Sequence, residues 1–235
     1  VIYDVLKYGR DFGKSNIGKG TKVQVEFVSA NPTGPMHMGN ARGAALGDAL
    51  ASILEMTGYD VTREFYINDA GNQIENFGLS LEARYLQLLG KDAEIPEGGY
   101  HGEDITEHMK ELIEKEGDRF LNMDSKTRRA YFIEYALKKN IQRMKEDLEA
   151  FGVHFDVWFS EQSLYESGKV DEVISELTKK GYTYEKDGAL WFKASALGAA
   201  KDEVLIRANG LPTYFASDIA YHKNKFDRGF DWVID

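Results

Sequence analysis

The segment from residue 23 to residue 57 constrains the fold more than any other part of the chain. It reads VQVEFVSANPTGPMHMGNARGAALGDALASILEMT, and in its first five positions apolar side chains alternate with polar ones, as in a β-strand. Two prolines and a glycine between Asn31 and Pro35 then exclude both helix and sheet. From Gly39 onward, small and apolar residues recur at helical spacing. The segment therefore predicts a strand, a rigid turn and a helix in direct succession.

The residues at the start of this predicted helix are suited to binding an anion. A helix N-terminus offers unpaired backbone N–H groups and the positive end of the helix dipole. His37, Gly39 and Asn40 lie at this entry point. Because Gly39 has no side chain, a flat or phosphorylated group can approach the backbone there. The arrangement is typical of a nucleotide-binding site.

The run Pro35-Met36-His37-Met38-Gly39-Asn40 resembles the H-I-G-H signature of class I aminoacyl-tRNA synthetases. The wider run VEFVSANPTGPMHMGNARGAALGDAL is similar to one family of that class, the arginyl-tRNA synthetases. The four-letter signature alone is weakly specific, whereas the longer run is strongly specific. Asn40 replaces the second histidine of the signature; its amide can still donate a hydrogen bond to a phosphate oxygen, but it adds no positive charge.

The resemblance implies an ATP-binding set at this turn, made of Pro35, His37, Gly39 and Asn40, with His37 and Asn40 as the catalytic residues. His37 would donate to the α-phosphate and stabilise the charge that develops as a carboxylate attacks. From residue type alone, a buried structural histidine remains the alternative.

The resemblance also implies an arginine-binding set. Ser29 and Asn31, at the exit of the first strand, would hold the α-amino and carboxylate groups of the amino acid. Tyr214 and Asp218 are four residues apart on a predicted helix and share one face. A guanidinium group requires carboxylates and neutral acceptors, which Asp218, Glu26 and the Tyr214 hydroxyl would supply. Spacing alone would favour an ordinary surface helix for Tyr214 and Asp218.

Periodicity and turn residues predict the rest of the chain. The expected helices are residues 73–89, 103–116, 125–151, 169–180 and a last helix from Pro212 to about residue 225. The expected strands are residues 59–67, 155–159, 182–184, 190–193, 203–208 and 230–235. The long helix is expected to bury a stripe made of Ile133, Leu137, Ile141, Met144, Leu148 and Phe151.

These elements predict an α/β fold with a Rossmann-like parallel sheet that is interrupted by a helix-rich α+β insertion. Residues 1–22 are interpreted as a linker remnant of a preceding domain, and residues 23–90 as the first half of the catalytic domain. Residues 91–200 are the expected connecting insertion, and residues 201–235 the return to the catalytic domain. Both ends are expected to be cut, so that the sheet is truncated in its C-terminal half.

Composition limits the partners of the chain. Its 235 residues are 43% hydrophobic and 29% charged, as in soluble globular proteins, and it contains no membrane-spanning run and no signal peptide. The absence of cysteine excludes disulfides and thiolate zinc sites and fits the cytoplasm. The histidines show no metal spacing, and no metal-ligating residues are predicted.

A net charge of −10 disfavours a generic nucleic-acid-binding surface. The basic pairs Arg128-Arg129, Lys138-Lys139 and Lys179-Lys180 are interpreted as solvated helix faces.

The resulting hypothesis is a partial catalytic domain that joins L-arginine to its tRNA through arginyl-adenylate. ATP would be a substrate, Mg²⁺ would accompany its phosphates, and the acceptor end of the arginine tRNA would be the partner. A monomer with little or no activity on its own is expected. The alternatives are another class I synthetase, a small nucleotidyltransferase, or a module that only folds and binds ligand weakly.

Overall fold

The computed structural model describes all residues from Val1 to Asp235. The chain divides into two compact units. The first comprises Val1–Phe27, Gly47–Tyr66 and Phe155–Asp235, and the second comprises Val28–Leu46 and Ile67–His154.

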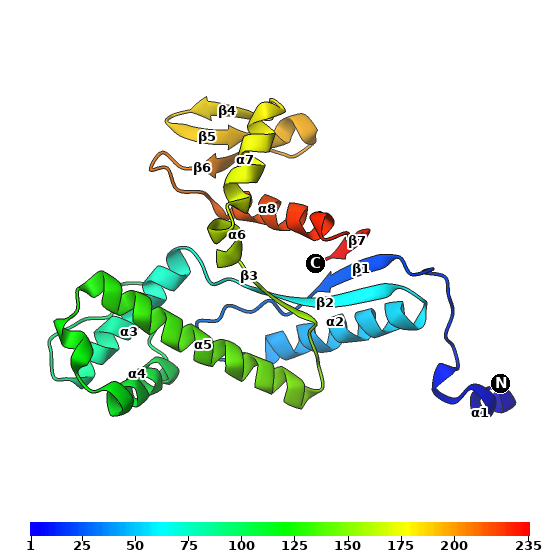
Figure 1. Cartoon of the computed structure of the whole chain (residues 1–235), viewed down its shortest axis with the longest axis horizontal. Helices are drawn as coiled ribbons and strands as arrows, with labels where there is room; N and C mark the ends of the chain where they lie inside the picture. The colour runs from blue at the N-terminus through cyan, green and yellow to red at the C-terminus, as the bar shows by residue number, and fades with distance from the viewer. The chain divides into compact units, whose positions relative to one another are not determined.

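A four-stranded sheet in the order β3-β2-β1-β7 organises the first unit. Strand β1 (Lys22–Glu26) pairs in parallel with both β2 (Asp60–Ile67) and β7 (Trp232–Ile234), and β3 (Val157–Ser160) forms the other edge. Helix α2 (Met38–Met56) connects β1 to β2 (Figure 1). The predicted βαβ unit and parallel sheet are therefore confirmed.

The buried face of α2 consists of small residues. Ala44, Gly47 and Ala51 are buried, whereas the larger Leu46 and Ile53 on the same helix are 73% and 59% exposed. A Cβ atom at Gly47 would overlap the Phe27 ring. Because residue 47 is glycine, the helix lies closer to the end of β1 than it could with any other residue at this position.

A second sheet in the first unit is antiparallel, in the order β4-β5-β6. Strands β4 (Thr183–Lys186) and β5 (Ala189–Phe192) form the predicted hairpin, in which Asp187 and Gly188 both have the positive φ of a type I′ turn. Strand β6 (Glu203–Ile206) was expected to return to the parallel sheet, but it pairs with β5 instead.

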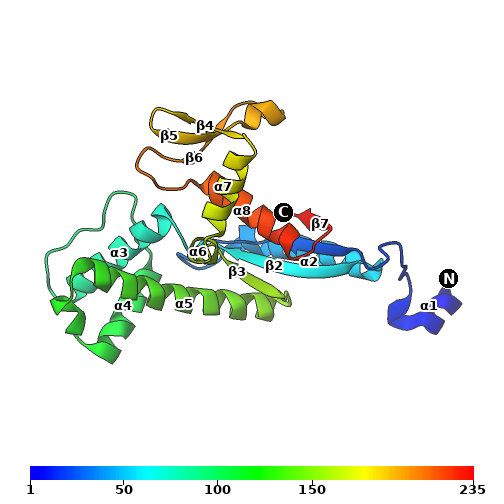
Figure 2. The same cartoon turned by 45° about the horizontal axis from the view of Figure 1, so that its top comes forward.

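Three helices complete this unit: α6 (Gln162–Glu166), α7 (Lys169–Lys179) and α8 (Tyr214–Asp227). Figures 1 and 2 show α7 beside the antiparallel sheet and α8. The core between them contains Leu164, Val170, Val173, Ile174, Leu205, Ala216, Ala220 and Tyr221. Pro212 was predicted to begin the last helix; instead it bridges to Ile206, and Thr213 is the N-cap.

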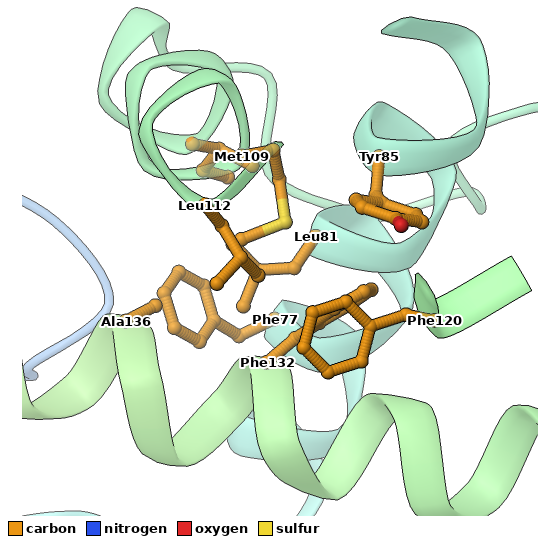
Figure 3. Packing of buried hydrophobic residues seen from close by; sticks show 9 residues of the cluster. Phe77, Leu81, Tyr85, Met109, Leu112, Phe120, Phe132 and Ala136 are labelled. Atoms are coloured by element: carbon orange, nitrogen blue, oxygen red, sulfur yellow. The ribbon is translucent and has the colours of Figure 1, made fainter. Parts of the chain in front are cut away.

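The second unit is built on α3 (Asn72–Leu88), α4 (Glu103–Glu116) and α5 (Ser125–Phe151). Its core contains Phe77, Leu81, Tyr85, Ile105, Met109, Leu112, Phe120, Phe132 and Ala136 (Figure 3). All three helices were predicted within one or two residues at each end.

The buried stripe of α5 differs from the predicted one. Its fully buried residues are Phe132, Ala136, Asn140, Met144 and Leu148, whereas Phe151 is 54% exposed. Hydropathy favoured the neighbouring Ile133 and Leu137 and passed over Asn140, because a buried amide has no hydrophobic signal.

The interpretation of Arg128-Arg129 as a solvated face is also wrong. The Arg128 side chain is 11% exposed and lies 2.6 Å from the Glu82 carboxylate, which also accepts hydrogen bonds from Ser125 and Arg129. These contacts join α3 to the start of α5.

The N-terminal residues form α1 (Ile2–Tyr8) and a 3₁₀ turn at Gly9–Asp11, neither of which has a buried residue. Backbone N–H groups of Ser15 and Gly18 then bond to the carbonyls of Met56 and Thr57 at the end of α2. Two more 3₁₀ turns lie at Arg119–Asn122 and Ala194–Leu197. None of the helices combines the length and apolar character needed to cross a membrane.

Candidate functional site

The loop that leaves β1 is held in an unusual backbone conformation. Val28 has φ 68° and Ser29 has φ 39°, in the left-handed region that β-branched residues rarely adopt. Such strain persists where the surrounding structure imposes it, and it concentrates at binding sites. The loop then passes through Asn31 to Pro35, and Pro32 and Thr33 are buried.

His37 and Asn40 cap the start of α2 reciprocally. The His37 Nδ1 atom accepts a hydrogen bond from the Gly39 N–H at 3.1 Å, and the Asn40 Oδ1 atom accepts one from the His37 N–H at 2.9 Å. This is the pattern of a capping box with histidine and asparagine in the two capping roles. Because Nδ1 is an acceptor, the ring proton lies on Nε2.

Gly39 is required by the same arrangement. A Cβ atom there would lie 2.9 Å from His37 Cε1 and 3.0 Å from Nδ1. The imidazole therefore occupies the space that the missing side chain leaves. From the sequence, a ligand was expected to occupy this space, whereas in the structure the His37 ring occupies it.

A cavity of about 460 Å³ brings together most of the residues predicted from the signature and its turn. Its lining contains Ser29, Asn31, Pro35, His37 and Asn40. His37 also borders a second, more apolar cavity of about 500 Å³ between the start of α2 and the end of α5. The polar cavity has the composition to bind a small polar ligand.

Two further residues of the polar cavity were missed by sequence reasoning. Tyr100 and Asp104 line it from the start of α4 and the loop before it. The Tyr100 N–H bonds to Ser80 Oγ at 2.9 Å, and its ring packs edge-on against Phe77. The only sequence signal was an acidic residue in the first turn of a helix, which is common at helix N-termini without any site.

A buried hydrogen-bond relay through Asn140 holds the turn that lines the cavity. The Asn140 Nδ2 atom donates to the Pro32 carbonyl at 2.8 Å, and its Oδ1 atom lies 2.7 Å from His108 Nε2. Since the amide oxygen is an acceptor, His108 is the donor in this pair. Burial lowers the pKa of His108. Asn140 thus ties the 31–35 turn to α4 and α5.

The residues predicted to bind the guanidinium group of the substrate, Glu26, Tyr214 and Asp218, lie in the first unit. Asp218 is on the exposed side of α8, 3.4 Å from His222 Nδ1, and lines a groove of about 430 Å³ between α7 and α8. Tyr214, one turn earlier, is 47% exposed. Glu26 reaches the same helix further along, where its Oε2 atom accepts a hydrogen bond from Lys225 Nζ at 2.8 Å. The structure therefore brings Glu26 to α8, with Lys225 as its cationic partner.

A second carboxylate, which is fully buried, lies near this pair. Glu64 is fully buried and accepts two hydrogen bonds from Arg228 and one from the Tyr221 hydroxyl at 2.6 Å. Burial and the nearby charges of Glu26 and Glu64 raise the pKa of Tyr221, so that the hydroxyl remains a donor. Neither Glu64 nor Lys225 was singled out by the sequence, because each stands among residues of ordinary strand and helix pattern.

The family described as tRNA synthetases class I (R), catalytic domain, has a sequence model that matches residues 2–234. The chain belongs to this family. The structure has the mixed α/β fold with a parallel sheet that the resemblance implied.

Among other class I (R) synthetases, the arginine–tRNA ligase of Caldanaerobacter subterraneus subsp. tengcongensis is 71% identical over 98% of this chain and 41% of its own length. The arginine–tRNA ligase of Acetivibrio thermocellus is 67% identical over all of this chain and 43% of its own length. The chain thus spans about two-fifths of the length of these curated relatives.

Solved structures agree with this assignment. A crystal structure of an arginyl-tRNA synthetase from Campylobacter jejuni has a TM-score of 0.85 and 37% identity, covering 97% of this chain and 50% of its own. Thermus thermophilus arginyl-tRNA synthetase has a TM-score of 0.59 and 24% identity over 86% of this chain and 35% of its own, a likeness of fold alone.

Proposed function

We propose that this chain forms part of the catalytic domain of an arginine–tRNA ligase, which activates L-arginine with ATP and transfers it to tRNA. The observation that carries the proposal is the polar cavity, where Ser29, Asn31, His37 and Asn40 meet in a chain of the class I (R) family. The names of its relatives, arginine–tRNA ligases, support arginine as the substrate.

In the proposed reaction the arginine carboxylate attacks the α-phosphorus of ATP, and pyrophosphate leaves. His37 donates its Nε2 proton in a hydrogen bond to an α-phosphate oxygen and stabilises the charge that builds up there. The Gly39 N–H holds the Nδ1 side of the ring, so this donor is oriented before the substrate arrives. No covalent enzyme intermediate is needed.

Asn40 has a different part in this scheme. Its Oδ1 atom caps the His37 backbone, so its Nδ2 group faces away from that bond and can donate to a phosphate oxygen. Asn40 therefore contributes orientation and one neutral donor, without the charge of a second histidine. Pro35 and Gly39 complete the ATP-binding set by shaping the turn.

Mg²⁺ would accompany ATP, but the cavity does not build a site for it. Mg²⁺ prefers octahedral oxygen coordination with several carboxylate, phosphate or water oxygens. The lining contains one carboxylate, Asp104, and the structure has no group of three potential metal-ligating side chains. In the proposed scheme the phosphate oxygens of ATP and water supply most ligands of the ion, and no residue of this chain is named as its ligand.

The proposed amino-acid site comprises Ser29 and Asn31 for the head group, and Glu26, Tyr214 and Asp218 for the guanidinium. Lys225 Nζ bonds to Glu26 in this structure, so a substrate guanidinium must share or replace that cation. Asp218 is 61% exposed, and its value to binding depends on how far the substrate buries it.

The arginine assignment is tested by Asp218→Asn. If the bound substrate desolvates the carboxylate, the variant loses about 3–5 kcal/mol of arginine affinity in a calorimetric titration. A loss below about 1 kcal/mol would assign Asp218 to the surface and favour a different class I amino acid. Asp227→Asn, an exposed acid on the same helix, is the matched control.

Catalysis is tested in a chimera in which this chain replaces the matching residues of the Caldanaerobacter enzyme. We expect ATP–pyrophosphate exchange that requires arginine and is not supported by lysine or glutamine. The chain alone is expected to exchange slowly or not at all. Exchange by the chain alone at the rate of the chimera would contradict that expectation.

The partners follow from the proposed reaction. The acceptor end of the arginine tRNA is the second substrate, and the site of action is the cytoplasm, where tRNA is charged for protein synthesis. A monomer is sufficient for the scheme, because every residue in it comes from one chain.

A further inference from the structure

Asp104 is the one formally charged carboxylate in the lining of the polar cavity. It lies in the first turn of α4, directly after Glu103, while Gly102 is the N-cap. The Asp104 residue is half-buried, but its Oδ2 atom is fully buried and has no hydrogen-bond partner. A Cβ atom at Gly34, in the opposite loop, would lie 3.8 Å from this oxygen. The carboxylate therefore faces the turn that contains Asn31 and Pro35.

The helix start does not account for this carboxylate. Acids in a first turn usually stay solvated or cap a backbone N–H. Glu103 is exposed, as a solvated helix-start acid should be. Asp104 instead folds back over Gly102, where any Cβ atom would overlap its Oδ1 atom. A buried carboxylate oxygen without a donor costs free energy, and such atoms call for an unseen partner.

Nearby side chains do not supply that partner. His108, one turn further along α4, uses Nε2 for its bond to Asn140, and burial lowers its pKa. No lysine or arginine lines the cavity. The cavity thus combines one unpaired carboxylate with neutral donors on Asn31, His37 and Asn40, which is a suitable lining for a zwitterion.

We propose that Asp104 is an amino-acid-binding residue whose carboxylate receives the α-ammonium group of the substrate in this cavity. The proposal rests on the proposed function. An α-amino acid presents an ammonium and a carboxylate on the same carbon, and the carboxylate must reach the phosphate that His37 contacts. Ser29 and Asn31 offer neutral contacts to this head group, while Asp104 supplies the charge that neutralises the ammonium.

The test compares arginine with 5-guanidinopentanoate, which is arginine without its α-amino group. NMR titration of the chain detects affinities down to the millimolar range, and the measurements are repeated in the chimera. Asp104→Asn is expected to weaken arginine binding about 10- to 100-fold, because it removes one hydrogen bond to a charged group. The variant is expected to leave 5-guanidinopentanoate binding unchanged, because that ligand has no α-ammonium group.

Two further variants separate position from charge. Gly102→Ala keeps the Asp104 carboxylate but displaces it at little cost to folding, because the atom in the way is the end of a flexible side chain. It is expected to reproduce the selective loss of arginine affinity. Glu103→Gln removes the neighbouring exposed charge and is expected to change neither affinity.

The outcomes are distinct. If Asp104→Asn binds arginine as the wild type does, or weakens both ligands equally, the role of Asp104 is overturned while the proposed function stands. If the variant weakens ATP binding only when Mg²⁺ is present, Asp104 belongs to the nucleotide's metal ion and the proposal is also overturned. If the wild-type chain and chimera bind neither arginine nor its analogue, the proposed function itself fails.

Discussion

Gly39 illustrates how a single atom can determine the geometry of a site. Its backbone φ lies outside the left-handed region, so the backbone itself would accept alanine. What excludes a side chain is the His37 ring, which lies 2.9 Å from the Cβ position. The requirement for glycine at this position is therefore steric and concerns the histidine.

Gly39→Ala should separate activity from stability. Alanine favours a helix over glycine, so the free energy of unfolding should stay equal or rise, while the displaced imidazole lowers exchange activity about 10- to 100-fold. Pyrophosphate exchange in the chimera and thermal unfolding of the chain measure the two effects. Gly43→Ala, on the same helix with open space at its Cβ position, should leave activity unchanged.

Asn140 is predicted to stabilise the second unit through its two buried hydrogen bonds. Asn140→Leu keeps the volume but leaves the Pro32 carbonyl and His108 without their partner, at a cost of about 1–3 kcal/mol in unfolding free energy. Urea denaturation measures the loss. The same change at exposed Gln142 should cost less than about 0.5 kcal/mol; equal costs would show that the relay contributes nothing.

At the scale of elements, α2 depends on close packing at one position. Gly47→Ala places a methyl group inside the Phe27 ring, which should destabilise the chain by about 1–3 kcal/mol despite the better helix propensity of alanine. Gly43→Ala, one turn earlier, should stabilise it by up to about 1 kcal/mol. Chemical denaturation of both variants should therefore give changes of opposite sign.

The junction of α3 and α5 depends on the buried carboxylate of Glu82. Glu82→Gln leaves Arg128, which is 11% exposed, without its anion, and should cost about 3–5 kcal/mol in unfolding free energy. Glu75→Gln on the same helix removes a carboxylate that is 57% exposed and should cost less than about 0.5 kcal/mol. Comparable losses in the two denaturation curves would contradict a buried pair.

At the scale of the whole molecule, the net charge of −10 opposes the approach of a polyanion. The chain alone should therefore bind tRNA no more tightly than about 10⁻⁴ M at 150 mM salt, in the weakest range of non-specific binding. A filter-binding series over salt concentration measures this. Micromolar binding with a steep salt slope would reveal a basic surface that the overall charge conceals.

The course of the backbone was largely predictable from the sequence. The boundaries of α4 and α5 agree with the expected ones at both ends, and the Asp187-Gly188 hairpin and the parallel pairing of β1 with β2 were also expected. These features depend on helix and strand propensity, on hydrophobic periodicity and on turn residues, all of which can be read from residues close together in the sequence. The family likewise followed from one continuous run of residues.

Tertiary structure alone decided which side chains meet. The burial of Asn140 and Arg128 and the place of Asp104 in the cavity had no local signal, because each depends on a partner far away in the chain. The pairing of β6 with β5 joins consecutive strands, but no tight-turn signal lies between them. A polar residue has the same appearance in a sequence whether water or a buried partner satisfies it. Local order along the chain thus determined the elements and the family, whereas packing between distant segments determined the chemistry of the cavity.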